Sequence, residues 1–142
     1  MSQFNQIRVI VLGLICHNDK LFVYKGYDEH KKQEFYRALG GGVDFGETSI
    51  EALLREFREE IQAELSNFRY LGCIESIFIN NNQPGHEIIQ VYSCDFANPK
   101  YYDLDKINFI DGNKEKTGLW IETGKFKSGE LILHPKAFLD YI

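Results

Sequence analysis

Three glutamates lie close together in the run Arg55-Glu56-Phe57-Arg58-Glu59-Glu60. At about 100° per residue, Glu56, Glu59 and Glu60 fall on the side and back of a helix, away from its apolar stripe. Carboxylates at this spacing present oxygen ligands to a hard divalent cation, and Mg²⁺ is usually held by a few carboxylates together with substrate phosphates. Arg55 lies beside them and can offset their repulsion with a bidentate ion pair. The spacing predicts a magnesium site, and a solvated acidic face is the alternative.

A glycine-rich turn at residues 40–42 leads into this helix. Thr48 followed by Glu51 has the form of a capping box, so the helix is predicted to begin near Thr48. Apolar residues at helical spacing predict the buried face: Ile50, Leu53, Leu54, Phe57 and Ile61. Ala52 is expected to leave space above the carboxylates. The glycine turn and Glu47 at this spacing favour a functional site over a solvated surface.

Residues 41–63 resemble the Nudix box. The resemblance rests on Gly41, five further residues, Glu47, seven further residues and then Arg55-Glu56-Phe57-x-Glu59-Glu60. Two positions depart from the pattern, because Gln62 stands in place of the usual glycine and Leu39 in place of a frequent proline. A glycine there normally ends the helix in a left-handed conformation. Without it, the helix is expected to continue toward Glu64.

The resemblance implies hydrolysis of a pyrophosphate bond in a nucleoside diphosphate derivative such as a nucleotide or nucleotide sugar. The implied ligands of Mg²⁺, or of Mn²⁺ in its place, are the Gly40 carbonyl, Glu56, Glu59 and Glu60. Arg55 would orient these glutamates from outside the metal shell, and Glu47 would support them through Arg55 or water. The general base stays open between Glu56, Glu59 and a carboxylate beyond the box.

Residues outside the box supply the other candidates for the site. Arg37 and Tyr36 come just before the glycine turn and are expected to contact substrate. Glu75 and Glu87 lie on neighbouring predicted strands and are candidates for additional metal ligands or bases, with solvent-facing positions as the alternative. A charged loop at residues 28–34 is either a solvated connector or a rim that brings Lys31 or Lys32 to a phosphate.

Apolar and β-branched runs predict strands along the rest of the chain, at residues 7–16, 21–24, 35–39, 68–79, 87–96 and 118–121. Gly26 is expected to end the second of them. Residues 98–113 are predicted to form a long loop and residues 124–129 a turn-rich connector. Pro135 can begin a final helix at residues 136–141.

This order of elements predicts an α+β fold with a mixed sheet. The resemblance implies the Nudix fold, in which mixed β-sheets are sandwiched between α-helices (α/β/α). At 142 residues, of which 44% are hydrophobic, the chain suits a single Nudix hydrolase domain over residues 1–142.

The net charge of −5 argues against binding long nucleic acid through its phosphates, but a small phosphorylated substrate can bind through a metal ion. Cys16, Cys73 and Cys94 lie in apolar runs, which predicts buried thiols in a reducing compartment. Neither a signal peptide nor a membrane-spanning run is found. We therefore expect a cytoplasmic protein without a membrane partner, for which a homodimer stays open.

Two other classes of function compete with the hydrolase. A non-catalytic Nudix-like sensor would bind a nucleotide without cleaving it, but such a domain is expected to lose metal-binding glutamates that this chain keeps. An enzyme that acts on an RNA 5′ cap fits poorly with the acidic balance and the lack of a basic stripe. The residues that mark some subgroups, a proline or a tyrosine after the box, are absent from residues 78–81, so the substrate is not identified.

Overall fold

The computed structural model describes residues 6–142, whose strands form two sheets. The first sheet has the order β5-β1-β7-β6 and contains β1 (Ile7–Leu14), β5 (Gly40–Gly42), β6 (Leu65–Asn80) and β7 (Gln83–Phe96). It is mixed, because β1 and β7 are parallel while its other pairs are antiparallel. The second sheet contains β2 (Cys16–His17), β3 (Lys20–Asp28), β4 (Gln33–Ala38), β8 (Lys106–Asp111) and β9 (Lys114–Glu122). Its order is β2-β3-β9-β8, with β4 paired to β3.

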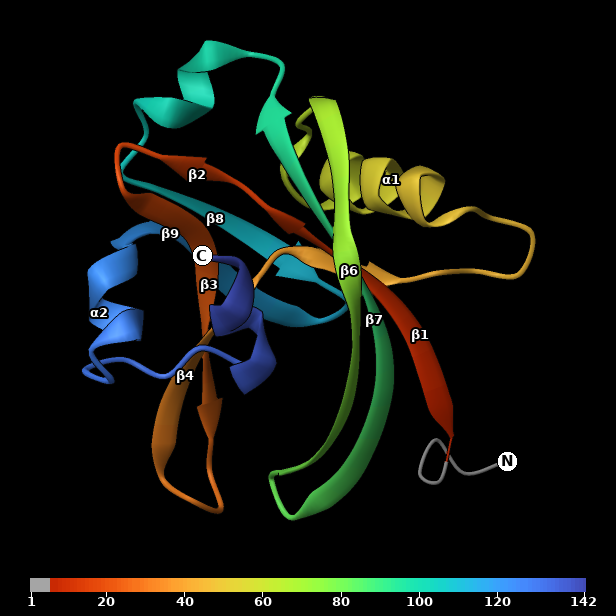
Figure 1. Ribbon diagram of the computed structural model, residues 1–142, viewed down its shortest axis with the longest axis vertical. Coiled ribbons are helices and arrows are strands. Elements are labelled where there is room, and N and C mark those ends of the chain that lie inside the picture. The colour runs from red at the N-terminus through yellow and green to blue at the C-terminus, as the bar shows by residue number, and fades with distance from the viewer. Residues whose placement is uncertain (1–5) are drawn as a thin grey trace.

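Helices cover both sides of these sheets. The helices α1 (Ser49–Ile61) and α2 (Thr123–Lys127) lie on opposite sides of the strands (Figure 1). Phe57 of α1 packs in one core, whereas Phe126 of α2 and Phe138 of the 3₁₀ helix η2 (Lys136–Tyr141) pack in the other. A second 3₁₀ helix, η1 (Pro99–Tyr102), follows β7. The α+β prediction and the helix–sheet–helix arrangement are confirmed.

The start of α1 follows the sequence closely, but its end does not. Thr48 Oγ1 accepts from the Glu51 N–H at 3.2 Å, and the Glu51 carboxylate accepts from the Thr48 N–H at 2.9 Å, which completes the predicted capping box. Contrary to expectation, the helix stops at Ile61. Gln62 adopts the left-handed conformation, with φ of 54°, and its N–H donates to the Arg58 carbonyl. A glutamine thus provides the stop that glycine usually gives.

Several expectations outside the helix are wrong because strand pairing and packing in the core decide the local structure. The predicted loop at residues 98–113 contains β8, whose backbone pairs with β9. β3 continues through Gly26 to Asp28 because β4 pairs with it along that length. The connector at residues 124–129 contains most of α2, which Phe126 anchors in the core.

Burial also differs from expectation at several small side chains. Cys16 and Cys73 are exposed, and of the three thiols only that of Cys94 is buried. Ala52 is fully buried in the core beneath α1, so it leaves no space above the carboxylates. Successive side chains of a strand point to opposite faces of the sheet, and this alternation decides which cysteine faces the interior. An apolar run alone does not show which of its residues face inward.

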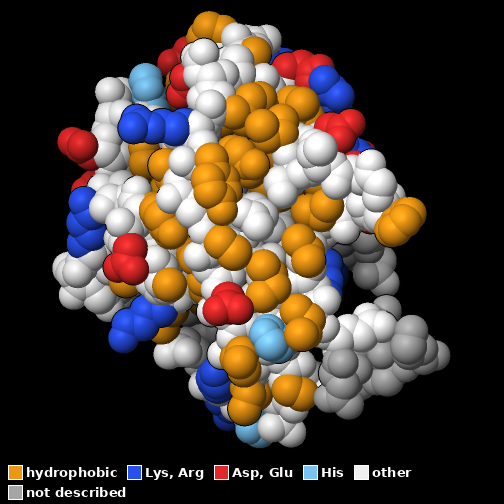
Figure 2. Space-filling model, turned by 45° about the vertical axis from the view of Figure 1, so that its right-hand side comes forward, with side chains coloured by type: hydrophobic (Ala, Val, Ile, Leu, Met, Phe, Trp, Pro, Cys, Tyr) orange, Lys and Arg blue, Asp and Glu red, His pale blue; other side chains and the backbone are white. Residues whose placement is uncertain are grey.

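One face of the first sheet exposes apolar side chains. Ile77 of β6 is 79% exposed and Ile7 of β1 is 61% exposed, and His86 of β7 lies between them in the pairing register. Figure 2 shows apolar side chains gathered over this face around few charged ones. Within residues 6–142, every helix is too short or too polar to span a bilayer.

Candidate active site

Arg55 connects the glycine turn, the loop after it and the acidic helix. Its Nε and Nη2 donate to the two oxygens of Glu47 at 2.7 and 2.9 Å. Its Nη1 donates to Glu56 at 3.0 Å and to Glu59 at 3.4 Å, and its Nη2 also donates to the Gly42 carbonyl at 3.0 Å. One guanidinium therefore holds the loop and two of the three helix carboxylates in a single arrangement.

Glu47 is committed to Arg55. The hydrogen bonds from Arg55 and from the Asp44 backbone N–H lower the pKa of Glu47 to about 2. The carboxylate is therefore charged at neutral pH, and both of its oxygens already accept hydrogen bonds from the guanidinium. Glu47 thus supports the site through Arg55 and leaves the role of proton acceptor to another group.

Glycine at position 41 lets the Glu56 carboxylate lie directly against the turn. A Cβ atom on Gly41 would lie 2.6 Å from Glu56 Oε1, which is closer than non-bonded atoms approach. The turn is itself fixed, because Gly41 is paired with Val11 of β1. A side chain at position 41 would therefore displace the carboxylate, so the glycine turn and the helix fit each other through Glu56.

Glu60 brings a second carboxyl group into the interior. Among the described residues, no group donates a hydrogen bond to its Oε1, although this atom is buried. Burial is the main cause that raises the pKa of Glu60, followed by the adjacent Glu56 carboxyl and the charge of Asp111. Asp111, at the end of β8, forms an ion pair with Lys116 of β9 at 2.7 Å. Charged groups from two distant segments, Glu56 on α1 and Asp111 on β8, thus act on Glu60, and a cation would relieve the repulsion.

Glu60 and Asp111 line a cavity of about 170 Å³ beside the glycine turn. Its charged side chains are Glu60, Asp111, Arg8, Arg37, Glu87 and Lys116. Arg37 donates from Nη2 to Glu87 at 2.8 Å, and Arg8 lies near the same carboxylate. The cavity therefore combines an acidic group with a group of cationic side chains.

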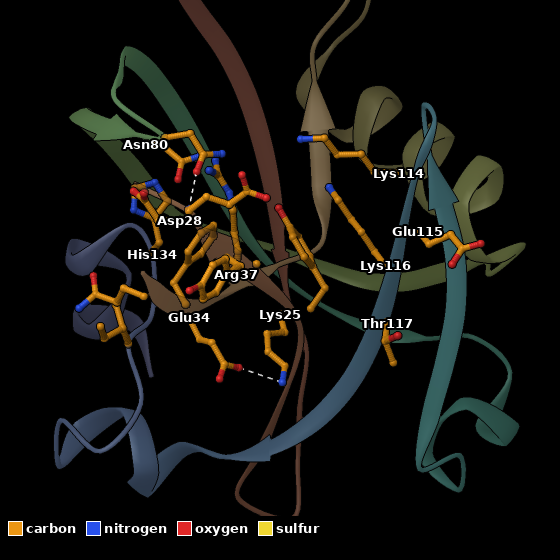
Figure 3. Close-up of a pocket in the computed structure, with 18 of the residues that line it drawn as sticks. Lys25, Asp28, Glu34, Arg37, Asn80, Lys114, Glu115, Lys116, Thr117 and His134 are labelled. Atoms are coloured by element: carbon orange, nitrogen blue, oxygen red, sulfur yellow. Dashed lines mark hydrogen bonds and ion pairs between the residues drawn. The ribbon is translucent and has the colours of Figure 1, made fainter. Parts of the chain in front are cut away.

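A much larger open cleft, of about 1680 Å³, adjoins the cavity. Tyr24, Arg37 and Lys116 line both spaces, so they mark the place where the two meet. Lys116 Nζ lies 4.3 Å from the centre of the Tyr24 ring. Figure 3 shows Arg37 near the centre of the cleft, with Lys116 extending from β9 on one side and His134 on the other.

His134 lies between aromatic side chains in this cleft. Its ring centre is 5.8 Å from that of Phe35 and 4.8 Å from that of Phe78. Burial, followed by the positive charge of Arg37, lowers the pKa of His134 to about 4. The imidazole is therefore neutral at pH 7 and offers one donor and one acceptor.

The structure brings together most, but not all, of the residues that the sequence suggested. Arg37 reaches the cavity, whereas the neighbouring Tyr36 points to the opposite face of β4 and packs against Phe126 in the core. Tyr36 is therefore not brought to the site. The Glu59 side chain is 60% exposed at the rim. Glu75 is exposed on β6 and lines neither the cavity nor the cleft.

Three charged residues of the cavity were not among the sequence candidates: Arg8, Asp111 and Lys116. Asp111 lies in the segment that was expected to be a loop, and Lys116 lies just beyond it on β9. Asp111 pairs with Lys114, so Gly112-Asn113 is the two-residue turn between β8 and β9, and this dipeptide is a hairpin signal that could have placed Asp111 and Lys116 on facing strands. Arg8 carried no signal, because nothing near it in the sequence relates it to the glycine turn.

The donor atoms suit a hard divalent cation. The groups that converge on the glycine turn are carboxyl oxygens and backbone, the ligands that Mg²⁺ prefers. The buried Glu60 Oε1 without a donor is an open acceptor in that position. Within residues 6–142, no three His, Cys, Asp or Glu side chains are already arranged around one metal position. Instead, Glu56 and Glu59 form ion pairs with Arg55, and Asp111 forms one with Lys116.

A family model described as the NUDIX domain matches residues 5–103, which is more than half of the chain. The match contains the glycine turn and all of α1, with Glu56, Glu59 and Glu60. It ends before β8, so Asp111 and Lys116 lie outside it.

Two curated relatives match shorter stretches. An RNA pyrophosphohydrolase from Ruthia magnifica subsp. Calyptogena magnifica is 34% identical over 61 residues, which cover 43% of this chain and 33% of the relative. An 8-oxo-dGTP diphosphatase from Buchnera aphidicola subsp. Schizaphis graminum is 28% identical over 69 residues, which cover 49% of this chain and 53% of the relative. The chain thus matches about a third and about half of the length of these relatives.

Solved structures extend the likeness to nearly the whole chain. A MutT NUDIX hydrolase from Burkholderia pseudomallei superposes with a TM-score of 0.63 at 19% identity, over 84% of this chain and 86% of the other. A NUDIX hydrolase from Nitrosomonas europaea gives a TM-score of 0.63 at 14% identity, over 95% and 85%. At these identities the likeness establishes the fold.

Proposed function

The chain belongs to the NUDIX family, and from this premise we propose that it hydrolyses a pyrophosphate bond in a nucleoside diphosphate derivative with the help of Mg²⁺. The observation that carries the proposal is the position of two helix carboxyl groups at the glycine turn, where Glu56 lies against Gly41 and Glu60 lines the adjoining cavity with Asp111. Like charges placed so close together are unfavourable in a purely structural role. The arrangement becomes favourable when a divalent cation binds.

The residues divide into two roles in this proposal. Glu56, Glu59, Glu60 and the Gly40 carbonyl would hold the metal, with Asp111 as the carboxylate beyond the box. When bound, Mg²⁺ neutralises phosphate charge and lowers the pKa of a coordinated water. Arg55 keeps the glutamates oriented through the contacts described above. A carboxylate of the cluster accepts the proton of the attacking water.

The shape of the site supports a nucleotide-like substrate. The small cavity beside the carboxyl groups has the size and charges for a phosphate group, and the adjoining cleft has space for the rest of the molecule. The aromatic and amide side chains that line the cleft can stack on, or hydrogen-bond to, a nucleoside. The names of the two curated relatives, an RNA pyrophosphohydrolase and an 8-oxo-dGTP diphosphatase, support the same class.

The test is a hydrolysis panel with Mg²⁺ over nucleoside triphosphates, ADP-ribose, nucleotide sugars, dinucleoside polyphosphates and coenzyme A. We expect phosphate or nucleotide release from at least one class, its loss in excess EDTA, and its return with Mg²⁺ or Mn²⁺. Undiminished hydrolysis in EDTA would exclude the metal-dependent mechanism. Tight binding of a panel member without any turnover would instead favour a non-catalytic sensor. This is the second candidate function, because Arg55 already donates hydrogen bonds to Glu56 and Glu59, two of the proposed metal ligands.

A further inference from the structure

Glu87 lies buried between two arginines that come from different sheets. Its Oε1 accepts a hydrogen bond from Nη2 of Arg37 at 2.8 Å, and its Oε2 lies 4.0 Å from Nη1 of Arg8. Arg8 is opposite Glu87 in the pairing of β1 with β7, whereas Arg37 reaches it from β4 of the other sheet. The Glu87 side chain is only 8% exposed. One carboxylate thus sets the positions of two guanidinium groups.

These guanidinium groups have hydrogen-bonding capacity to spare. A guanidinium carries five N–H donors. Within the described residues, Arg37 donates from Nη2 to Glu87, and its side chain lines both the cavity and the cleft. The Arg37 side chain is only 12% exposed, yet none of its nitrogens is among the buried polar atoms that lack a partner in residues 6–142, so its remaining N–H groups are accessible to a ligand. The two arginines also leave a net positive charge after Glu87 is counted.

A phosphate group is the anion that fits this arrangement. Its oxygens match the planar fork of arginine, which binds them in a bidentate manner. Glu60 and Asp111 line the same cavity and would repel an anion alone. With a divalent cation on these carboxyls, the cation and the arginines would hold the same phosphate from two directions.

We propose that Glu87 is a positioning residue that holds Arg37 and Arg8 as a clamp for a phosphate group of the substrate. The proposal rests on the proposed function for the identity of that substrate. Glu87 itself contacts neither the metal nor the reacting atoms, because Arg37 occupies its Oε1 and Arg8 lies beside its Oε2. It acts through the arginines, so its removal affects substrate binding before it affects the chemical step.

The first test is Glu87→Gln, with kcat and KM measured separately on the best substrate of the panel. We expect KM to rise roughly 10- to 100-fold, the worth of a charge-assisted hydrogen bond, while kcat stays within about threefold. Glu75→Gln is the matched control, because Glu75 lies on the adjacent strand but is exposed outside both spaces. A fall in kcat at constant KM would overturn the positioning role.

A double-mutant cycle with Arg37→Gln separates the clamp from an ion pair that merely stabilises the fold. If Glu87 acts through Arg37, adding Glu87→Gln to Arg37→Gln should raise KM by only the small share that Arg8 contributes. Equal factors in both backgrounds would contradict the proposal. Circular dichroism and thermal melting show whether each variant is folded.

Binding of inorganic pyrophosphate separates this proposal from the proposed function. In calorimetry with Mg²⁺, the wild type should bind pyrophosphate, and Glu87→Gln and Arg37→Gln should each weaken it at least about tenfold. That result supports the clamp even if no panel substrate is cleaved. Equal affinity of all three proteins, or no binding by the wild type, would refute the clamp while hydrolysis could still stand.

Arg8→Gln keeps the test decisive if Glu87→Gln fails to fold. The Arg8 side chain is 60% exposed, so its replacement should leave the fold intact. We expect a rise in KM of roughly three- to tenfold, smaller than for Arg37 because Arg8 lies farther from Glu87. An unchanged KM together with unchanged pyrophosphate affinity would exclude Arg8 from the clamp and contradict the proposal.

Discussion

The two groups of charged residues around the cavity are built in different ways. The acidic group comes mainly from one continuous segment, in which the turn at Gly41 and the helix carrying Glu56 and Glu60 follow each other within residues 40–61. The cationic group is assembled from separate strands, with Arg8 on β1, Arg37 on β4 and Lys116 on β9. A group that lies on one continuous segment can be recognised from the sequence. A group that comes from separate strands is brought together only when the protein folds.

The difference also separates what each group is expected to do. In the proposed function the acidic group would supply the metal ligands and the base, and the family model covers its glycine turn and helix. Arg37 and Lys116 line the cleft as well as the cavity, whereas Arg8 lines the cavity alone, so in this proposal the cationic group would hold a phosphate group of the substrate where the two spaces meet. Substitutions in the first group should abolish turnover, and substitutions in the second should change affinity.

The largest effect is expected for Gly41→Ala. The added Cβ would collide with the Glu56 carboxylate and displace it, and a displacement of about 1 Å at a reacting centre can cost roughly 10²-fold in rate. The control is Gly124→Ala, because a Cβ there meets no atom within 4 Å. Turnover and circular dichroism should show a folded but nearly inactive Gly41→Ala protein and an active control. Normal turnover of Gly41→Ala would mean that the position of Glu56 is unimportant.

Arg55→Ala should have the next largest effect. It removes every contact that joins the loop to Glu56 and Glu59, so activity should fall about 10- to 100-fold while the helix stays folded. Arg58→Ala is the matched control on the same helix, since Arg58 pairs only with Glu64 at the surface. Circular dichroism and kcat/KM measure both. Unchanged kcat/KM in a folded Arg55→Ala protein would remove the orienting role.

Glu60→Gln tests the metal site through stability. Without metal, the exchange replaces a carboxyl group that lies beside the Glu56 carboxyl and the charge of Asp111 by a neutral amide, so the melting temperature should rise by roughly 2–5 °C. The further rise caused by Mg²⁺ should shrink, because a charged ligand is gone. Thermal melting with and without Mg²⁺ measures both changes, with Glu75→Gln as the control. A full Mg²⁺ shift in Glu60→Gln would place the metal elsewhere.

The smallest effect concerns pH and His134. The pKa of His134 is about 4 in the folded protein against 6.5 for a free histidine. The folded state therefore binds the proton less readily than the unfolded state does, and protonation destabilises the fold. The contribution of the neutral form to stability is complete above pH 6.5 and is lost as pH falls toward 4, amounting to at most about 3 kcal/mol. His134→Gln should flatten the loss of unfolding free energy between pH 6.5 and 4, as measured by urea denaturation. The exposed His30→Gln is the control, and identical pH profiles would contradict the burial of His134.

The acidic group could be predicted because its signals are local. Thr48 and Glu51 mark the start of the helix, and the spacing of the three glutamates determines the side of the helix on which they lie. Both signals can be read without the rest of the chain. The stop at Gln62 could not be predicted in this way, because the residue adopts a left-handed conformation that glutamine rarely takes. There the burial of Ala63 and Leu65 decides the direction of the chain.

The cationic group could be predicted only in part. The position of Arg37 just before the turn placed it correctly in the cavity, but the same argument included Tyr36, which alternation on β4 turns into the core. Asp111 and Lys116 depend on the pairing of β8 with β9, and Arg8 depends on the pairing of β1 with β5 and β7. The pairings of β1 join segments that are far apart in the sequence, and the strand sequences alone do not specify them. β8 and β9 instead form a hairpin, whose two-residue turn is a local signal.

The contacts of Arg55 have a consequence for the entropy of substrate binding. Because Glu47 and the Gly42 carbonyl are held by the same side chain as Glu56, the loop at residues 43–47 and the helix form one unit before any ligand arrives. Loops that become ordered only on binding lose conformational freedom at that moment, which weakens the observed affinity. Here that loss occurs during folding, so this part of the site meets its substrate already rigid, and more of the interaction energy is available for the phosphate itself.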